Sequence, residues 1–310
     1  MNRDSKILIY GAGVIGSIFA GMIAKSGYNI TILARGKHHN ELHQNGLVLN
    51  NCLSGEQIKL QVNLINVLNE DDIYDYIIVI VQNTQIDSIL PILSKNKSPN
   101  IVFVVNNPSG YQKWIDAVGY ERIMIGFPSA GGERKDGMVN YYIGKGIAKI
   151  FQATTFGELN GEKTKRLLKL VRVFKDAGFA PSISNNMDAW QKTHVAVILP
   201  IGKALNRFDS NNYKLAKSSG TIKQMLLATR ECFEVLKELN IKVTPSKLNI
   251  YYLPLFLLVP IFMRTMDTKI AETAYSKHNL VAQNEMEILE EQFRALIASS
   301  GVKTPNFNSL

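Results

Sequence analysis

A glycine-rich turn close to the N-terminus constrains the fold of this chain more than any other feature. The sequence GAGVIG at Gly11–Gly16 directly follows a short apolar run, Lys6–Tyr10. A helical pattern with its apolar residues on one face, Ile15–Ser26, comes next. A strand, a G-x-G-x-x-G turn and a helix in this order predict a dinucleotide-binding unit, in which the helix N-terminus binds a pyrophosphate. A glycine-rich turn without any ligand is the alternative.

Each glycine of the turn has a separate expected task. Gly11 permits the tight turn, Gly13 lets the backbone approach the pyrophosphate, and Gly16 lets the helix pack closely on the strand. We therefore assign the whole turn to cofactor binding: Gly11, Ala12, Gly13, Val14, Ile15 and Gly16.

Strand-like and helical segments alternate through the first half of the chain. Besides Lys6–Tyr10, strands are predicted at Asn29–Leu33, Tyr76–Val81, Ile101–Val105 and Arg122–Gly126. This alternation predicts parallel strands joined by right-handed crossovers, that is, a doubly wound α/β sheet of the Rossmann type. A hairpin made of Gly137–Ile143 and Ile147–Phe151, and a closing helix at Glu162–Ala177, are expected after it.

The strand signal ends near residue 185. Three long helical patterns cover the second half: Asn186–Leu205, Ser219–Leu239 and Met266–Ser299. We place the boundary in the loop Gly178–Asn186. The sequence thus predicts a Rossmann domain at 1–184 and an all-helical domain at 185–310.

Composition agrees with two globular domains and limits the partners. The chain has 310 residues, of which 46% are hydrophobic and 20% charged. Its net charge of +9 fits an anionic ligand or a solvated basic surface. The basic residues are dispersed and no nucleic-acid-binding signature is present, so we expect no nucleic acid partner. The two cysteines, Cys52 and Cys232, favour a reducing, cytoplasmic location, and we expect no metal site.

One segment, Tyr251–Met263, is unusually apolar. It is shorter than a membrane-spanning helix, and Pro254 and Pro260 interrupt it. We therefore expect a buried helix or a subunit contact in a homodimer, and no membrane partner.

The end of the second predicted strand carries positive charge. An NAD site usually has an acidic residue there for the ribose hydroxyls, whereas this chain has Arg35 and Lys37 in LARGK. An arginine can pair bidentately with a 2′-phosphate, which favours NADP(H) over NAD(H). Solvated loop charges are the alternative.

Two charged residues fall on predicted apolar helix faces. Asn186–Leu205 is apolar nearly all round after its first turn, so Lys192 lies on an enclosed face and is a candidate proton donor. Glu285 and His278 share the core-facing stripe of Met266–Ser299, and a buried carboxylate needs a partner, for which Lys192 is a candidate. A snorkelling lysine, a hydrogen-bonded structural glutamate and a core histidine are the alternatives.

Taken together, the motifs resemble those of the ketopantoate reductase (2-dehydropantoate 2-reductase) family over essentially the whole length. The resemblance depends on GAGVIG at Gly11–Gly16, LARG at Leu33–Gly36, NNPSG at Asn106–Gly110, the glycine-rich hairpins at Gly131–Gly146, WQKT at Trp190–Thr193, and EMEILEEQFRALIASSGVKTP at Glu285–Pro305. It implies an N-terminal Rossmann domain, a helical C-terminal domain, an active site in the cleft between them, and NADPH as hydride donor to a small anionic 2-oxo acid. The family's own reaction belongs to pantothenate biosynthesis.

The resemblance also implies roles for individual residues. Lys192 matches the family's catalytic lysine, which gives a proton to the carbonyl oxygen as hydride arrives at carbon. Glu285 matches an acidic residue that orients the lysine or binds a substrate hydroxyl. Asn107 matches an asparagine near the nicotinamide and the substrate.

Several positions depart from the family pattern. Gln82 stands where the family usually has a second lysine, near the cofactor. Ala196 and Pro200 replace asparagines, Thr273 replaces a serine, and Lys277 replaces an acid. His194 and His278 are hypothesised to make polar contacts in place of the missing asparagines. The departures leave two alternatives to ketopantoate reduction: a non-catalytic NADP(H)-binding sensor or partner protein, and a related hydroxy-acid dehydrogenase with a different substrate.

Overall fold

The computed structural model describes residues 4–143, 153–281 and 283–310. The chain divides into two compact units, which are described separately below. The first unit contains Met1–Val105 and Tyr111–Met187, and the second contains Asn106–Gly110 and Asp188–Leu310. The division in the structure thus follows Met187, three residues beyond the 184/185 boundary expected from the sequence, and a short loop of the first half groups with the second unit.

The first unit is built on an eight-stranded sheet with the order β12-β11-β8-β7-β6-β1-β2-β5. Its strands are β1 (Lys6–Tyr10), β2 (Asn29–Leu33), β5 (Asn63–Ile65), β6 (Tyr76–Val79), β7 (Ile101–Phe103), β8 (Ile123–Phe127), β11 (Thr154–Glu158) and β12 (Pro181–Ile183). Six strands of this sheet, β5, β2, β1, β6, β7 and β8, are parallel to their neighbours within this group. They follow the 3-2-1-4-5-6 order of doubly wound folds. The predicted fold class is confirmed.

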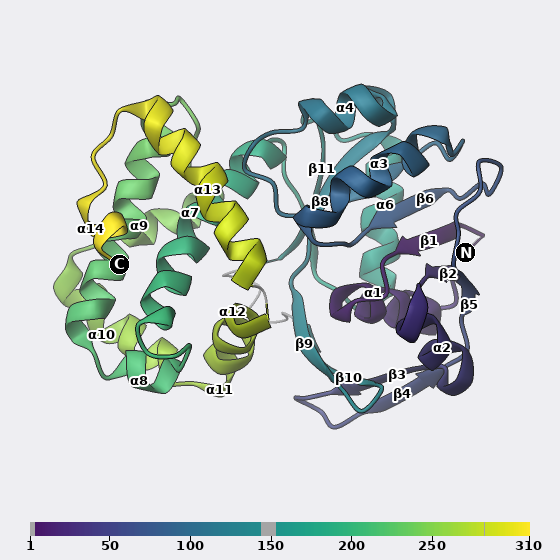
Figure 1. Cartoon of the computed structure of the whole chain (residues 1–310), viewed down its shortest axis with the longest axis horizontal. Helices are drawn as coiled ribbons and strands as arrows, with labels where there is room; N and C mark the ends of the chain where they lie inside the picture. The colour runs from purple at the N-terminus through teal and green to yellow at the C-terminus, as the bar shows by residue number, and fades with distance from the viewer. Residues whose placement is uncertain (1–3, 144–152, 282) are drawn as a thin grey trace. The chain divides into compact units, whose positions relative to one another are not determined.

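Helices connect these strands (Figure 1). They are α1 (Val14–Lys25), α2 (Gly36–Asn45), η1 (Asn83–Gln85), α3 (Ile86–Lys95), α4 (Gln112–Val118), η2 (Tyr120–Arg122) and α6 (Lys165–Asp176). The predicted strands and the two predicted helices agree with the structure to within three residues at each end. β1 is buried from Ile7 to Tyr10 because neighbouring strands and helices cover it on all sides.

A second sheet, with the order β4-β3-β10-β9, packs on α1. Its strands are β3 (Leu47–Asn51), β4 (Gln57–Leu60), β9 (Ala130–Lys135) and β10 (Met138–Ile143). The contact with α1 is close, because a Cβ added at Gly21 would lie 2.5 Å from the Leu49 Cδ1 atom. β10 confirms the predicted strand Gly137–Ile143. The strand that pairs with it in an antiparallel hairpin is β9, and the expected partner, Ile147–Phe151, lies outside the described residues.

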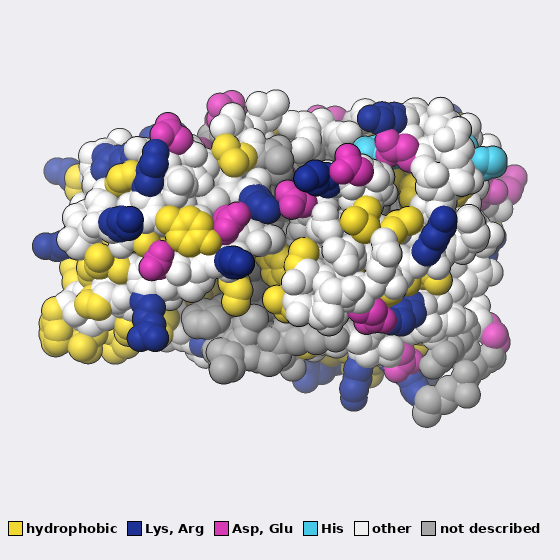
Figure 2. Space-filling view, turned by 90° about the horizontal axis from the view of Figure 1, so that it is seen from below, with side chains coloured by type: hydrophobic (Ala, Val, Ile, Leu, Met, Phe, Trp, Pro, Cys, Tyr) yellow, Lys and Arg dark blue, Asp and Glu magenta, His cyan; other side chains and the backbone are white. Residues whose placement is uncertain are grey.

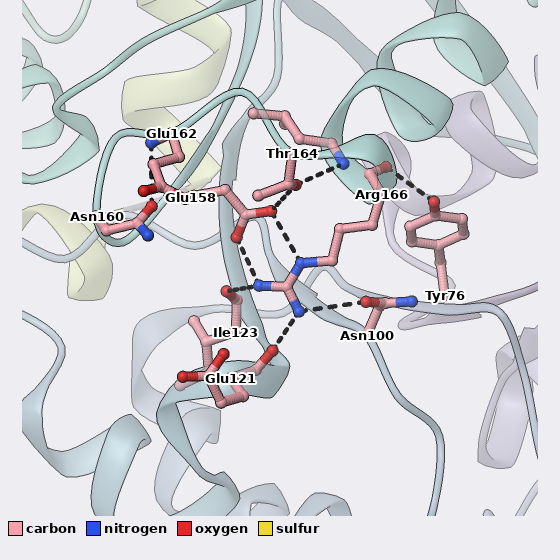
Figure 3. A network of polar contacts seen from close by, with 10 residues as sticks. Tyr76, Asn100, Glu121, Ile123, Glu158, Asn160, Glu162, Thr164 and Arg166 are labelled. Carbon is pink, nitrogen blue, oxygen red and sulfur yellow. Dashed lines mark hydrogen bonds and ion pairs between the residues drawn. The ribbon is translucent and has the colours of Figure 1, made fainter.

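A buried ion pair lies at the amino ends of β6 and β8, which is the end of the main sheet opposite the glycine-rich turn (Figure 3). Arg166, at the start of α6, donates from Nε to Glu158 Oε1 at 2.8 Å and from Nη2 to Oε2 at 2.5 Å. Glu158 is only 3% exposed. Arg166 also donates to the Ile123 carbonyl, and its own carbonyl accepts from Tyr76 Oη at 2.9 Å. The network therefore joins α6 to β6, β8 and β11.

The described part of the second unit is all-helical, as predicted. It contains α7 (Met187–Asn206), α8 (Asn212–Ala216), α9 (Ser219–Glu238), η3 (Ser246–Tyr252), α10 (Leu255–Met266), α11 (Lys269–Ala271), the π-turn η4 (Glu272–Ser276), α12 (Lys277–Val281), α13 (Gln283–Ser300) and α14 (Pro305–Ser309). Its core is separate from that of the first unit and centres on α7, α9 and α13.

The predicted helical segment Met266–Ser299 is helical at residues 269–281 and at Gln283–Ser300, and it contains the π-turn η4. Asn212 of α8 ends α10 by donating from Nδ2 to the carbonyls of Met266 at 2.7 Å and Thr268 at 3.2 Å. The Ser276 hydroxyl donates to Asn212 Oδ1 at 3.0 Å, which fixes the π-turn. The wider π-turn shifts the direction of the apolar stripe expected along this segment.

The predicted apolar segment Tyr251–Met263 forms parts of η3 and α10 and is only partly buried. Its exposed side chains and their neighbours form what we call the η3–α10 patch: Ile250, Tyr252, Leu253, Phe256, Leu257 and Ile261. Figure 2 shows hydrophobic side chains gathered on the left of the view, on the second unit. Among the described residues no single helix is long and apolar enough to span a membrane, although η3 and α10, bent by 112°, pass that test as a pair.

Candidate functional site

The turn after β1 has the geometry that a phosphate-binding loop requires. Gly11 has a φ of 120°, and a Cβ there would lie 2.1 Å from the Ile80 carbonyl oxygen. A Cβ at Gly16 would lie 2.0 Å from the Gly11 carbonyl oxygen, so both positions require glycine. A Cβ at Gly13 would meet nothing within 4 Å, so the turn is open on that side.

The N-terminus of α1 is suited to an anion. Gly13 is its N-cap, and in the described structure no side chain caps the helix and no acidic residue lies in its first turn. The first N–H groups and the positive end of the helix dipole therefore favour a phosphate. Val14 and Ile15 are half-buried, and Ala12 is buried beneath the turn.

Arg134, which the sequence did not indicate, holds this turn through two hydrogen bonds. Arg134 Nη2, on β9, donates to the Ala12 carbonyl and to the Ser17 hydroxyl, both at 2.8 Å. Burial lowers the pKa of the Arg134 guanidinium, and the nearby Glu41 carboxylate opposes that shift. No local pattern signals this contact, because Arg134 lies more than one hundred residues along the chain from the turn.

Arg35, at the end of β2, is held by a tyrosine. Its Nη2 donates to Tyr10 Oη at 3.0 Å, and its guanidinium carbon lies 6.0 Å from the centre of the Tyr10 ring. Burial raises the pKa of Tyr10, and Arg35 partly offsets this rise. Lys37 is 87% exposed, and its Nζ lies 3.6 Å from Glu41 Oε1. Arg35 is thus oriented at the carboxyl edge of the sheet, whereas Lys37 is a solvated charge.

Three further predicted residues lie in loops. Gln82 is exposed after β6, where its backbone N–H donates to Gln85 Oε1 at 3.1 Å in the cap of η1. Asn107 is buried and holds its own loop, since Nδ2 donates to the Gly110 carbonyl at 2.7 Å and Oδ1 accepts from the Ser109 N–H at 3.0 Å. The neighbouring Asn106 contacts Glu285, with Nδ2 3.4 Å from Oε1. The tandem asparagines gave no indication of which one would face Glu285.

Lys192 occupies the enclosed position on α7 that the sequence predicted. Its side chain is 13% exposed, and Nζ lies 2.6 Å from Asp188 Oδ2, one turn earlier on the same helix. Lys192 was a candidate partner for Glu285, but the described structure pairs Lys192 with Asp188 and brings Glu285 to Asn106. The i,i+4 spacing of Asp188 and Lys192 was a usable signal that the burial argument overlooked.

The remaining candidates have structural contacts in the second unit. His194 stacks on Trp190 with ring centres 5.7 Å apart. The Thr273 hydroxyl donates to the Lys269 carbonyl at 3.0 Å, and Lys277 Nζ lies 4.0 Å from Glu272. The side chain of His278 lies outside the described part of the structure. Ala196 and Pro200 are buried on α7.

Over the described ranges, with their gaps at 144–152 and 282, no three His, Cys, Asp or Glu side chains are placed to hold a metal ion.

The sequence and the fold of the chain are similar to those of known reductases and dehydrogenases. The chain is 25% identical over 227 residues to the 2-dehydropantoate 2-reductase of Pyrococcus horikoshii, which covers 71% of each protein. Its fold is similar to that of 2-dehydropantoate 2-reductase from Geobacter metallireducens, with a TM-score of 0.78, 16% identity, and 98% and 97% of the two chains covered. It is also similar to D-mandelate dehydrogenase solved with NADH and anilino(oxo)acetate, with a TM-score of 0.74, 19% identity, and 98% and 95% covered.

The family match falls on the unit that contains the glycine-rich turn. Residues 7–159 match the model of the family described as ketopantoate reductase PanE/ApbA. This range includes the turn, Arg35, Gln82, the loop Asn106–Gly110 and Arg134. Ketopantoate reductases are oxidoreductases that act on a C=O/CH–OH pair. By its family match and its fold, this chain carries at residues 7–159 the domain of the ketopantoate reductase PanE/ApbA family.

Proposed function

We propose that the protein is an NADPH-dependent reductase of a small 2-oxo acid. The observation that carries the proposal is the open turn at Gly13, at the uncapped N-terminus of α1, followed at the end of β2 by Arg35 and no acidic residue. The turn offers N–H groups to a pyrophosphate, and Arg35 offers its guanidinium to a 2′-phosphate. The family match to a nicotinamide-dependent reductase supports the same cofactor class.

Lys192 is proposed to act as the general acid. Hydride passes from the nicotinamide to the carbonyl carbon, and the Lys192 ammonium gives a proton to the carbonyl oxygen, so that a hydroxy acid and NADP⁺ result. The neutral amine then regains its proton from water. Asp188 supports this role because its carboxylate, 2.6 Å away, orients the ammonium. Glu285 and its partner Asn106 are proposed to contact the substrate.

Ketopantoate itself is one candidate substrate among several. Ala196 and Pro200, four and eight residues after Lys192 on α7, have no hydrogen-bonding side chain. A more apolar 2-oxo acid would suit such a helix better than an acid with a hydroxyl group to bind. The structural similarity to D-mandelate dehydrogenase supports the inclusion of such an acid in the test. A hydroxy-acid dehydrogenase of different substrate range is therefore the second candidate function.

The test is NADPH oxidation by the purified protein in the presence of separate 2-oxo acids. The panel should contain ketopantoate, 2-oxoisovalerate and phenylglyoxylate, each followed at 340 nm. Turnover of ketopantoate above the others would support a role in pantothenate biosynthesis, and turnover of phenylglyoxylate would support the second candidate. Tight NADPH binding without turnover of any acid would favour the non-catalytic alternative.

We further propose that the protein is a cytoplasmic homodimer that associates through the η3–α10 patch. The side chain of Phe256 is 76% exposed, and exposed apolar patches of this kind commonly mark contacts between proteins. The two free cysteines, Cys52 and Cys232, support a reducing compartment. Light scattering after gel filtration tests the association: the mass of a dimer supports it, and the mass of a monomer contradicts it.

A further inference from the structure

Arg134 links the second sheet to the glycine-rich turn. A single nitrogen, Nη2, donates to the Ala12 carbonyl and to the Ser17 hydroxyl, both at 2.8 Å. Ala12 lies inside the turn, and Ser17 lies in the first turns of α1. The guanidinium thus contacts the turn and the helix start together, from the side on which β9 lies.

The Ala12 carbonyl belongs to the same peptide group as the N–H of Gly13. In a planar trans peptide the C=O and N–H bonds point in opposite directions. A hydrogen bond that fixes the Ala12 oxygen therefore also fixes the direction of the Gly13 N–H, which points away from Arg134. The same hydrogen bond polarises the peptide and makes that N–H a stronger donor. Gly13 is exposed, and a Cβ built there would meet nothing within 4 Å, so a ligand oxygen can approach this position.

The charge of Arg134 acts in the same direction as this geometry. The guanidinium is half-buried, and the Ala12 and Ser17 oxygens that accept its hydrogen bonds are neutral. It lies beside the N-terminus of α1, which carries the positive end of the helix dipole. The nearby Glu41 carboxylate offsets part of the Arg134 charge. An anion bound at the helix N-terminus would offset more of the cost of burying the cation.

We propose that Arg134 is a cofactor-positioning residue, which holds the Ala12–Gly13 peptide in the orientation that binds the pyrophosphate of the dinucleotide. This inference rests on the proposed function for its ligand. It assigns to β9, an element outside the strand-turn-helix motif, a share in cofactor affinity. Arg134 acts on the pyrophosphate, which NADPH and NADH share, whereas Arg35 acts on the 2′-phosphate, which only NADPH carries.

The test measures dissociation constants without turnover, by fluorescence titration of the full-length protein with NADPH and with NADH. Arg134→Met is expected to raise the dissociation constants for NADPH and NADH by the same factor, about 10- to 100-fold. Arg134→Lys keeps a donor and a charge with a shorter reach, and is expected to recover part of the loss. Lys135→Met removes one positive charge from the same strand at an exposed position, and is expected to leave both constants within about twofold.

A second ligand separates positioning from general damage to the unit. Adenosine 2′-monophosphate lacks the pyrophosphate, so Arg134→Met should leave its binding unchanged while Arg35→Met weakens it. The inference is overturned if Arg134→Met binds NADPH and NADH like the wild type, if it loses adenosine 2′-monophosphate to the same extent, or if Lys135→Met matches its effect. Should Arg134→Met not fold, Arg134→Lys with wild-type affinity for both dinucleotides would also overturn it. A wild-type protein that binds neither dinucleotide would instead refute the proposed function.

Discussion

The Nζ atom of Lys192 lies 2.6 Å from Oδ2 of Asp188, one turn earlier on α7. The lysine side chain is 13% exposed and the aspartate 38%. The carboxylate therefore stands at the more exposed end of the pair and holds the ammonium in one direction. A proton donor needs this kind of orientation, because its effect depends on hydrogen-bond reach to the reacting oxygen.

From this pair we predict that Asp188→Asn slows the reaction without weakening the binding of the cofactor. The variant keeps the size of the side chain and removes the charge that orients Lys192, so kcat should fall roughly tenfold, as expected for the loss of a charge-assisted hydrogen bond. The dissociation constant for NADPH should stay the same. Asp209→Asn breaks an exposed pair with Lys214 and serves as the control. An unchanged kcat for Asp188→Asn would contradict the orienting role.

Arg35 predicts the cofactor preference. Arg35→Met removes the guanidinium that Tyr10 holds at the end of β2. It should weaken the binding of NADPH about tenfold or more and change the affinity for NADH by less than about twofold. Lys37→Met should have a smaller effect, because this side chain is 87% exposed. Titration of each variant with both dinucleotides checks this. Equal losses for NADPH and NADH would refute contact with a 2′-phosphate.

The local elements of the first unit were predictable because their signals lie within short stretches of sequence. Lys6–Tyr10 is apolar throughout, as a central parallel strand requires, and the glycines that follow are dictated by contacts with the Gly11 and Ile80 carbonyls. β4 and β9 gave no such signal. Their sequences, QIKL and AGGERK, are short, polar edge strands whose pairing depends on partners far along the chain.

The site was predictable in part for the same reason. Lys192 follows from the pattern of one helix, and Asp188 lies on that helix too. Asn106 and Arg134 reach their partners across 179 and 122 residues, so no window of sequence contains the contact. The π-turn in the last predicted helix also has a distant contact, because the Ser276 hydroxyl donates to Asn212 of α8, 64 residues away.

The ion pair between Arg166 and Glu158 predicts a large effect on stability. Arg166→Met would leave a carboxylate that is 3% exposed without its main partner, and such losses cost about 3–5 kcal/mol. Urea unfolding measures the change. Lys25→Met breaks an exposed pair with Glu56, whose side chains are 44% and 53% exposed, and should cost less than about 1 kcal/mol. Equal effects of the two substitutions would show that the Glu158–Arg166 pair is not effectively buried.

Glu290 predicts part of the acid sensitivity of the second unit. Burial raises the pKa of this carboxyl, but hydrogen bonds from Arg294 and Lys203 outweigh burial, and the net pKa is lowered. The group therefore contributes stability above its unfolded pKa of about 4.3, and this contribution is lost as the pH falls through the folded value. Glu290→Gln should show a smaller loss of unfolding free energy on going from pH 7 to acid. An unchanged pH slope would refute the coupling.

The central claim is that Lys192 supplies the proton, and one comparison tests it most directly. Lys203 lies on the same helix, is 18% exposed, and is paired with Glu290 at 3.1 Å, so it matches Lys192 in burial and pairing. With the best 2-oxo acid of the panel at saturation, Lys192→Ala should lower kcat for NADPH oxidation by about 100-fold or more and leave NADPH affinity unchanged. Lys203→Ala should keep kcat within about threefold of the wild type. A Lys192→Ala enzyme that turns over as fast as Lys203→Ala would contradict the mechanism.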